Sequence, residues 1–195
     1  MAAPFTGRLL VAAPALLDPH FVKTVVLMLE HDPDSGALGV VLTRPSETAV
    51  VEILPAWAGL ATAPAVVHVG GPVSPSGAIG LAALRTDARA AVPAGSFATL
   101  PAGEHGSLVL GTVDLDGDVD VLGPAVAALR IFAGYAGWGV GQLEAEVAEG
   151  GWYVVDALPL DPFVATPDRL WHDVLTRQGP PLSLVTRMPS DPTQN

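Results

Sequence analysis

Cysteine is absent from this sequence of 195 residues, and charged side chains are scarce. Without cysteine there is no disulfide bond, no thiolate nucleophile and no sulfur-ligated zinc site, and the composition fits a reducing compartment such as the cytoplasm. Only 15% of the residues are charged, whereas 50% are hydrophobic. Because disordered chains are typically poor in hydrophobic residues and rich in net charge, this composition favours a compact, soluble domain.

Basic residues are also few, nine against 20 acidic residues, which gives a net charge of -11. Since neutralisation of phosphates supplies most of the affinity for nucleic acids, so acidic a chain is disfavoured as a direct DNA-binding protein. Long hydrophobic runs are missing too. The charge-free stretch Leu9–Leu17 is interrupted by Pro14 and falls short of the roughly 18 to 20 residues that span a bilayer, so we expect no membrane insertion.

Apolar runs rich in β-branched residues alternate with turn residues along most of the chain. They predict strands over residues 7–13, 22–31, 37–43, 66–70, 78–84, 107–113, 129–135 and 152–155. The dense turn sequence Asp32–Gly36 predicts an antiparallel hairpin with a five-residue loop between the second and third of these strands. Strands therefore dominate the expected fold.

Three segments carry helix signals. A helix over residues 46–54 is expected to begin at the cap residue Ser46, a second over 143–149 to stop at Gly150, and a third to begin at Thr166 before a proline. The chain length predicts one domain, with two as the less favoured alternative.

We therefore predict a single α+β domain over residues 7–184, with a mainly antiparallel sheet flanked by a few helices. A polar, frayed tail over residues 185–195 is expected to follow it.

Common catalytic and metal-binding motifs are missing. The sole lysine, Lys23, does not follow a glycine loop, so there is no phosphate-binding P-loop, and no G-x-S-x-G elbow of a serine hydrolase occurs. In the glycine-rich stretch 137–141, Gly137 and Gly139 match the first two glycines of a dinucleotide-binding fingerprint, but Gln142 stands where the third glycine is required. The alternating aspartates of residues 114–120 lack the turn glycine and the bidentate glutamate of a calcium loop, and the histidines are too scattered for a zinc motif. We expect no metal and no cofactor.

The glycine-rich turn between a predicted strand and a predicted helix is the strongest remaining candidate. Backbone N–H groups at such a helix start can hold an anion, although the favoured interpretation is that the glycines only permit a tight turn while Glu144 complements the helix dipole. Trp138 in this turn is expected to be partly exposed and available to a partner.

Two further polar positions complete the candidates. Arg44 at a strand end either binds a carboxylate or phosphate or forms an internal salt bridge. His31 is interpreted as a solvated strand-end residue whose neighbours Glu30 and Asp32 face the opposite side. The candidate ligand or partner surface comprises His31, Arg44, Gly137, Trp138, Gly139, Gly141, Gln142 and Glu144.

Several blocks of sequence stand out by their order and spacing. They are Ala12–Phe21, Glu30-His31, Gly36–Pro45, Gly70–Val73, Arg130–Trp138, Gly141–Glu144, Gly150–Trp152 and Leu170-Trp171. Together they resemble the YqgE/AlgH family from about Gly7 to Leu175, which is nearly the whole chain. The sequence departs from the family pattern at Thr43, where asparagine is usual, and at Lys23-Thr24, where arginine and serine are common.

The resemblance implies a bacterial cytoplasmic protein with one α+β domain whose antiparallel sheet curls into a barrel-like shape. It implies no established enzyme activity and supplies no catalytic residues. The one role named for the family is that of a transcriptional regulator of alginate production.

Two hypotheses of function follow. The first is a non-enzymatic regulatory or interaction protein that acts through a protein or small-ligand partner, because nucleophile and metal signatures are missing and the net charge opposes DNA binding. The alternative is a module for a small anionic ligand, or a hydrolase-like enzyme, that uses the turn at residues 137–141 with Arg44, His31 and Glu144 converging on it.

Overall fold

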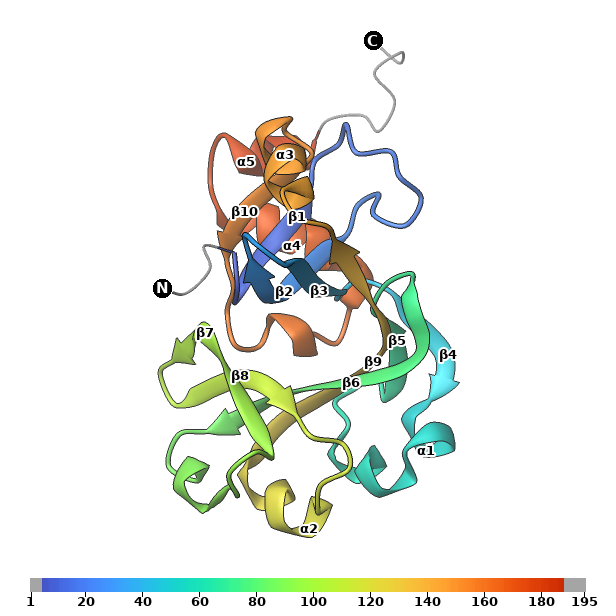
Figure 1. The fold of residues 1–195 in the computed structure, drawn as a ribbon, viewed down its shortest axis with the longest axis vertical. Coiled ribbons are helices and arrows are strands. Elements are labelled where there is room, and N and C mark those ends of the chain that lie inside the picture. Colours follow the sequence, from blue (N-terminus) through green and yellow to red (C-terminus); the bar gives the residue numbers. More distant parts are fainter. Residues whose placement is uncertain (1–4, 188–195) are drawn as a thin grey trace.

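A large sheet of mainly antiparallel strands runs through the whole molecule, with short helices around it (Figure 1). The computed structural model describes residues 5–187, apart from the side chains of residues 102–105. The expected single α+β domain with a mainly antiparallel sheet is confirmed.

Most of the strands lie where the apolar runs predict them. The described strands are β1 (Arg8–Ala12), β2 (Val25–Asp32), β3 (Gly36–Val41), β4 (Pro45–Ala49), β5 (Val66–Val69), β6 (Val73–Arg85), β7 (Phe97–His105), β8 (Leu108–Val113), β9 (Val126–Trp138) and β10 (Trp152–Asp156). The hairpin is present, because β2 and β3 pair antiparallel with Asp32 opposite Gly36. The strands β4 and β7 have no counterpart in the prediction, since each contains a proline, a residue that strands admit at free edges, at bulges or at their first position.

The helices are all short. They are α1 (Val50–Ile53), α2 (Val119–Leu122), α3 (Gln142–Ala148), α4 (Leu170–Arg177) and α5 (Leu182–Val185), with the 3-10 turns η1 (Pro55–Leu60), η2 (Arg89–Ala91), η3 (Gly123–Ala125), η4 (Asp161–Phe163) and η5 (Pro167–Arg169). Within residues 5–187, no helix has the length and apolar character that crossing a bilayer requires.

The predicted caps are wrong in detail. Ser46 lies in β4, where its hydroxyl accepts the N–H of Thr48 at 3.1 Å, and α1 begins only after Ala49. The side chain of Thr166 caps nothing, because the chain first makes the turn η5 before α4 begins. The predicted domain boundary at residue 184 falls inside α5, whose Val185 is buried, and residues 188–195 of the predicted tail lie outside the described residues.

The strands β6 and β9 connect the two halves of the sheet. The strand order is β10-β1-β2-β3-β9-β6-β8-β7, and β4 and β5 form a branch in which β5 pairs parallel with β9. The upper end of β9 pairs with β3, and the rest of it pairs with β6 (Figure 1). The four strands β1, β2, β3 and β10 therefore form one half, and β6, β7 and β8 form the other.

The expected barrel-like shape is wrong, because the sheet neither closes nor curls strongly. Its terminal strands β10 and β7 do not pair with each other among the described residues. Register shifts in the pairing of β6 with β9, between Val73 and Ala78 and between Ala83 and Leu84, mark irregularities in the long strands. Such bulges increase local twist, so the sheet turns from one half to the other rather than joining its edges.

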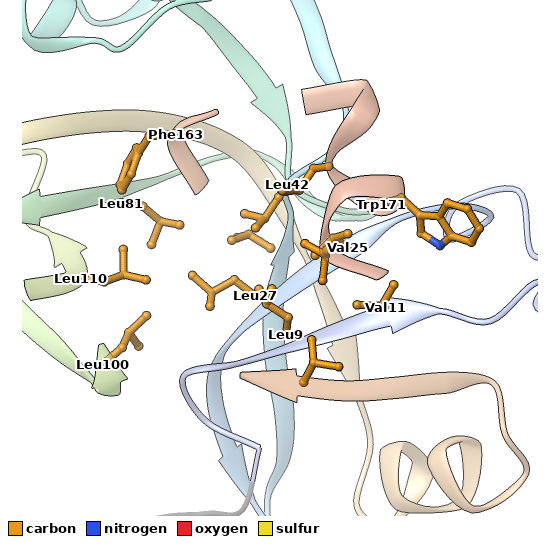
Figure 2. Packing of buried hydrophobic residues seen from close by; sticks show 14 of the residues in the cluster. Leu9, Val11, Val25, Leu27, Leu42, Leu81, Leu100, Leu110, Phe163 and Trp171 are labelled. Carbon is orange, nitrogen blue, oxygen red and sulfur yellow. The ribbon is translucent and has the colours of Figure 1, made fainter. Parts of the chain in front are cut away.

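One hydrophobic core fills the space between the two halves. Leu9, Val11, Val25 and Leu27 point from β1 and β2 into the same interior as side chains from the other half (Figure 2). The helix α4 also packs into this core, and the indole N–H of Trp171 donates to the carbonyl of Ala12 at 2.8 Å.

The opposite face of β1 and β2 is buried as well. Leu10, Val26 and Met28 alternate with the residues of the first core and pack in a second cluster that includes Leu143 of α3. Strands buried on both faces read as continuous apolar runs, which is why the sequence between Leu9 and Ala13 has no polar alternation.

A close backbone contact joins the two halves at one end. Gly7, just before β1, has a φ of +79°, and a Cβ built on it would lie 1.8 Å from the carbonyl oxygen of Pro101 in β7. Its N–H donates to the carbonyl of Met28 at 2.8 Å. Only glycine permits both this φ and this approach.

We predict that Gly7→Ala destabilises the protein by about 2 to 4 kcal/mol, because it adds a steric clash with Pro101 to the strain of a positive φ. Gly95→Ala is the matched control, since Gly95 has a φ of +88° but nothing within 4 Å of its Cβ position. It should cost only about 1 kcal/mol. Urea unfolding of both variants measures the difference, and equal losses would show that the contact with Pro101 contributes nothing.

Candidate functional site

Two hollows adjoin where the halves of the sheet meet. The larger has a volume of about 810 Å³ and is walled by β2, β3, β6, β7 and β8. The smaller, of about 410 Å³, lies between the β2–β3 hairpin and the end of β9. Glu30 and Leu38 line both. We call the first hollow the large cleft and the second the small cleft. The two clefts together form the groove.

The walls of the groove are apolar and acidic. Leu29, Leu38, Ile79, Leu100 and Leu115 supply apolar surface in the large cleft. The carboxylates belong to Glu30, Asp32, Asp114 and Asp116. None of the described residues that line either cleft is basic, so the groove carries a negative potential.

The acidic residues of β2 reach the groove because of strand alternation. Glu30 and Asp32 are exposed, whereas His31 between them is buried, which confirms that His31 faces the other side. The N–H of Asp34 donates to the carboxylate of Asp32 at 2.7 Å and holds the pKa of Asp32 below its usual value. Asp32 is therefore ionised at neutral pH.

His31 and Glu144 meet on the far side of β2. The Nε2 of His31 lies 2.7 Å from the Oε1 of Glu144, and the His31 side chain is only 1% exposed. The interpretation of His31 as a solvated residue was therefore wrong. The pKa of Glu144 is lowered by its own backbone N–H and then by the hydrogen bond with His31, while the ring of Phe5 covers the imidazole at a centroid distance of 4.7 Å. This pair links β2 to α3 and does not line the groove.

The prediction that Trp138 is partly exposed was also wrong. Trp138 ends β9 rather than sitting in a turn, and it is 5% exposed. Its indole N–H donates to Oε2 of Glu146 at 3.0 Å, and that of Trp152 donates to the same oxygen at 2.8 Å. The ring of Phe21 stacks on Trp138, which completes an aromatic cluster around the glutamate.

Glu146 is the residue of this region that the sequence did not single out. Its Oε1 accepts from the side chain of Gln142, one helical turn earlier, at 2.9 Å. The i, i+4 spacing of Gln142 and Glu146 on one helix face was the available signal. Its two indole donors come from strands and could be identified only in the fold.

The glycine-rich turn satisfies its own polar groups. The N–H of Gly139 donates to the side chain of Gln142 at 3.0 Å, and Gly141 adopts a φ of +72° before the seven-residue helix α3. Gly137 belongs to β9, where it pairs with Leu38. This geometry agrees with the favoured interpretation, in which the glycines serve a tight turn.

Arg44 does not join the other candidates. It follows the end of β3, whereas His31 pairs with Ala37 at the start of that strand. Its guanidinium donates to the carbonyl of Pro19 at 3.0 Å, and no carboxylate within the described part of the chain pairs with it. The convergence of Arg44, His31 and Glu144 is therefore not realised, and the internal salt bridge is absent within the same residues.

A perturbed histidine that the sequence did not indicate lies deep in the core. His68 of β5 is fully buried, and its Nδ1 lies 3.2 Å from the carbonyl of Val66. Burial, and after it the charge of Arg130, lowers the pKa of His68 to about 4. His68 is therefore neutral at pH 7.

The alternating aspartates 114–120 are used in local turns. Asp114 accepts the N–H of Asp116 at 3.0 Å, and Asp118 caps α2 by accepting the N–H of Asp120 at 2.9 Å. Among the described residues, no three His, Asp or Glu side chains are grouped as a metal ion would require.

Comparison with known proteins agrees over nearly the whole chain. The family described as DUF179: AlgH-like matches residues 9–183. A UPF0301 protein of Streptomyces coelicolor is 52% identical over 194 residues, which cover 97% of this chain and 95% of the relative. A UPF0301 protein of Mycobacterium tuberculosis is 47% identical over 189 residues, covering 97% and 90%.

Two solved structures share the fold. An X-ray crystal structure of a protein from Corynebacterium diphtheriae has a TM-score of 0.81 and 33% identity, covering 95% of this chain and 94% of that one. The solution structure of the AlgH protein from Pseudomonas aeruginosa has a TM-score of 0.63 and 29% identity, covering 97% of both chains.

We predict that His68 makes stability fall with acid. The unfolded chain binds a proton near pH 6.5, but folded His68 binds one only near pH 4, so its stabilising contribution is complete above pH 6.5 and is lost between these values. The loss amounts to about 3 kcal/mol. Urea unfolding at several pH values should show this slope in the native protein and not in His68→Gln.

His172→Gln is the control, because His172 is exposed on α4 and should leave the slope intact. If His68→Gln does not fold, titration of the His68 ring by NMR in the native protein gives the same answer. A His68 pKa near 6.5 would contradict the prediction.

Proposed function

The chain belongs to the AlgH-like family, and on that premise we propose that it is a non-enzymatic regulatory or interaction protein that holds a partner in the groove. The observation that carries the proposal is the groove itself. Its larger part, about 810 Å³, combines apolar walls with a few polar groups, which is the usual character of a binding site.

The positions of the polar side chains His31, Glu144 and Glu146 support the non-enzymatic part of the proposal. A general base or nucleophile has to face the space where substrate binds. The His31–Glu144 pair instead joins β2 to α3 under Phe5, and Glu146 is occupied by two indoles. These residues stabilise the walls around the groove.

A module for anions is less well supported. The carboxylates of Glu30, Asp114 and Asp116 repel a phosphate or a carboxylate from the large cleft. Arg44, the cation expected to hold such a ligand, lies at the other end of β3 and binds the carbonyl of Pro19. A hydrolase-like mechanism would also need Arg44, His31 and Glu144 to lie together, and they do not.

The role named for the family in transcription is compatible with the proposal only if regulation passes through a protein or small-ligand partner. The net charge of -11 opposes contact with a phosphate backbone. The large cleft, which is the proposed binding surface, is lined by carboxylates and would repel DNA.

We predict no tight binding to duplex DNA at physiological salt, because the chain offers nine basic residues against 20 acidic ones. Fluorescence anisotropy of labelled duplexes tests this, with a known DNA-binding protein as the positive control. Sequence-dependent binding that survives physiological salt would contradict a partner-mediated role.

We predict that a fluorophore in the large cleft reports binding without conversion. Because the chain has no cysteine, Ala98→Cys places one solvent-sensitive label on an exposed residue that lines the cleft, and Ala145→Cys on α3 is the matched control. The probes are end-blocked peptides of positive, zero and negative charge, spermidine, ATP and inorganic phosphate.

At least one peptide should give a saturable change at position 98 and none at position 145, and chromatography should recover it intact. ATP and phosphate should give no change. Silence at position 98 with every probe, or steady conversion of a probe that stops in His31→Gln, would reject the proposed function.

A further inference from the structure

We propose that the occupant of the groove is an extended, basic segment of a partner protein, with apolar side chains between its lysines or arginines. This inference rests on the proposed function and specifies the partner. It is supported by the charge and the spacing of the groove carboxylates, by the apolar walls and by the free edge of β7.

The charge of the groove selects a cationic occupant. Glu30 lines both clefts, Asp32 lies in the small one, and Asp114 and Asp116 lie in the large one. The carboxylates of Glu30 and Asp116 are exposed and take no part in any hydrogen bond or ion pair among the described residues. They are therefore available to a partner.

The spacing of two carboxylates fits an extended peptide. Glu30 and Asp32 project from the same face of β2, two residues apart. At a strand rise of about 3.3 Å per residue, they are separated by about 6.6 Å, which is also the interval between alternate side chains of an extended peptide. Two basic side chains at positions i and i+2 of a partner match this pair.

The apolar walls of the large cleft favour an occupant that has apolar side chains as well as positive charge. Leu38, Ile79 and Leu115 in the large cleft are only partly buried and keep apolar surface in contact with water, whereas Leu29 and Leu100 beside them are buried. A small polyamine would leave much of this surface in water. Apolar side chains between the basic ones would cover it, at a gain of roughly 25 cal/mol for each Å² removed from water.

The edge of β7 favours an extended segment over a helix. The consecutive residues Ala98, Thr99, Leu100 and Pro101 all line the large cleft, although side chains alternate along a strand. This part of the strand therefore borders the cleft, and β7 ends the strand order with no further neighbour among the described residues. An unpaired edge of this kind can accept an added strand.

Charge disfavours both a second copy of this chain and a nucleic acid as the occupant of the groove. Each copy carries a net charge of -11, so two acidic surfaces would face each other in a dimer across the groove. A nucleic acid meets the same repulsion. The remaining macromolecular class is a partner protein with a locally basic segment.

The test uses the full chain and a fluorescein-labelled, end-blocked octapeptide, Gly-Lys-Leu-Arg-Val-Lys-Leu-Gly. Two matched peptides replace its basic residues by glutamine or by glutamate. Anisotropy at physiological salt should show saturable binding of the basic peptide, about tenfold weaker binding of the glutamine peptide and none of the glutamate peptide.

A matched pair of double variants locates the binding. Glu30→Gln with Asp116→Asn removes two groove carboxylates, whereas Glu149→Gln with Asp168→Asn removes two exposed carboxylates that line neither cleft. Both change the net charge from -11 to -9, so long-range attraction is equal. The groove variant should bind the basic peptide about fivefold to tenfold more weakly, and the control variant less than about twofold more weakly.

The outcomes separate this inference from the proposed function. Equal binding of the basic and glutamine peptides, or equal affinity of the two double variants, overturns the basic segment while the function as a binding protein stands. Displacement of the peptide by spermidine at lower concentration overturns it in favour of a small polyamine. If no peptide binds and the label at position 98 stays silent, both fail together.

Discussion

The buried guanidinium of Arg130 holds the centre of this fold. Arg130 lies in β9, the strand that pairs with β3, β5 and β6, and it is 1% exposed. Its nitrogens donate to the carbonyls of Ala63, Pro162 and Val164 at 2.8 to 3.0 Å, and burial lowers its pKa to about 10. Arg130 stays charged at neutral pH. Backbone carbonyl groups stabilise this charge, and no carboxylate among the described residues pairs with it. Such a charge keeps its place only if all three segments stay where they are.

This constraint shapes the groove at a distance. Arg130 fixes the segments before β5 and around η4 against β9, the strand that also pairs with β6, and Ile79 and Gly80 of β6 line the large cleft. The lowered pKa of His68 has the same origin, since burial and the nearby charge of Arg130 disfavour a second cation. A neutral imidazole and a charged arginine thus share one core.

Local patterns predicted most strands and the fold class, but not the helix caps or the contacts between residues distant in sequence. The β2–β3 hairpin, the alternation of Glu30 and Asp32 against His31, and α3 follow from short-range periodicity. The strand β7 was not predicted because its proline and its glycine oppose strand propensity, which a free edge tolerates. The roles of Glu146 and Arg130 depend on donors and acceptors that are distant in sequence, and the family resemblance did not supply them.

The contact between Gly7 and Pro101 affects the width of the opening of the large cleft. Thr6 and Pro101 both line the large cleft, so this contact between main-chain atoms sits on its rim. The aperture there is set by backbone rather than by side chains. Substitutions of wall residues can therefore change the charge and hydrophobicity of the cleft while the main-chain opening keeps its width. The same backbone could then bind molecules of different chemistry but similar width.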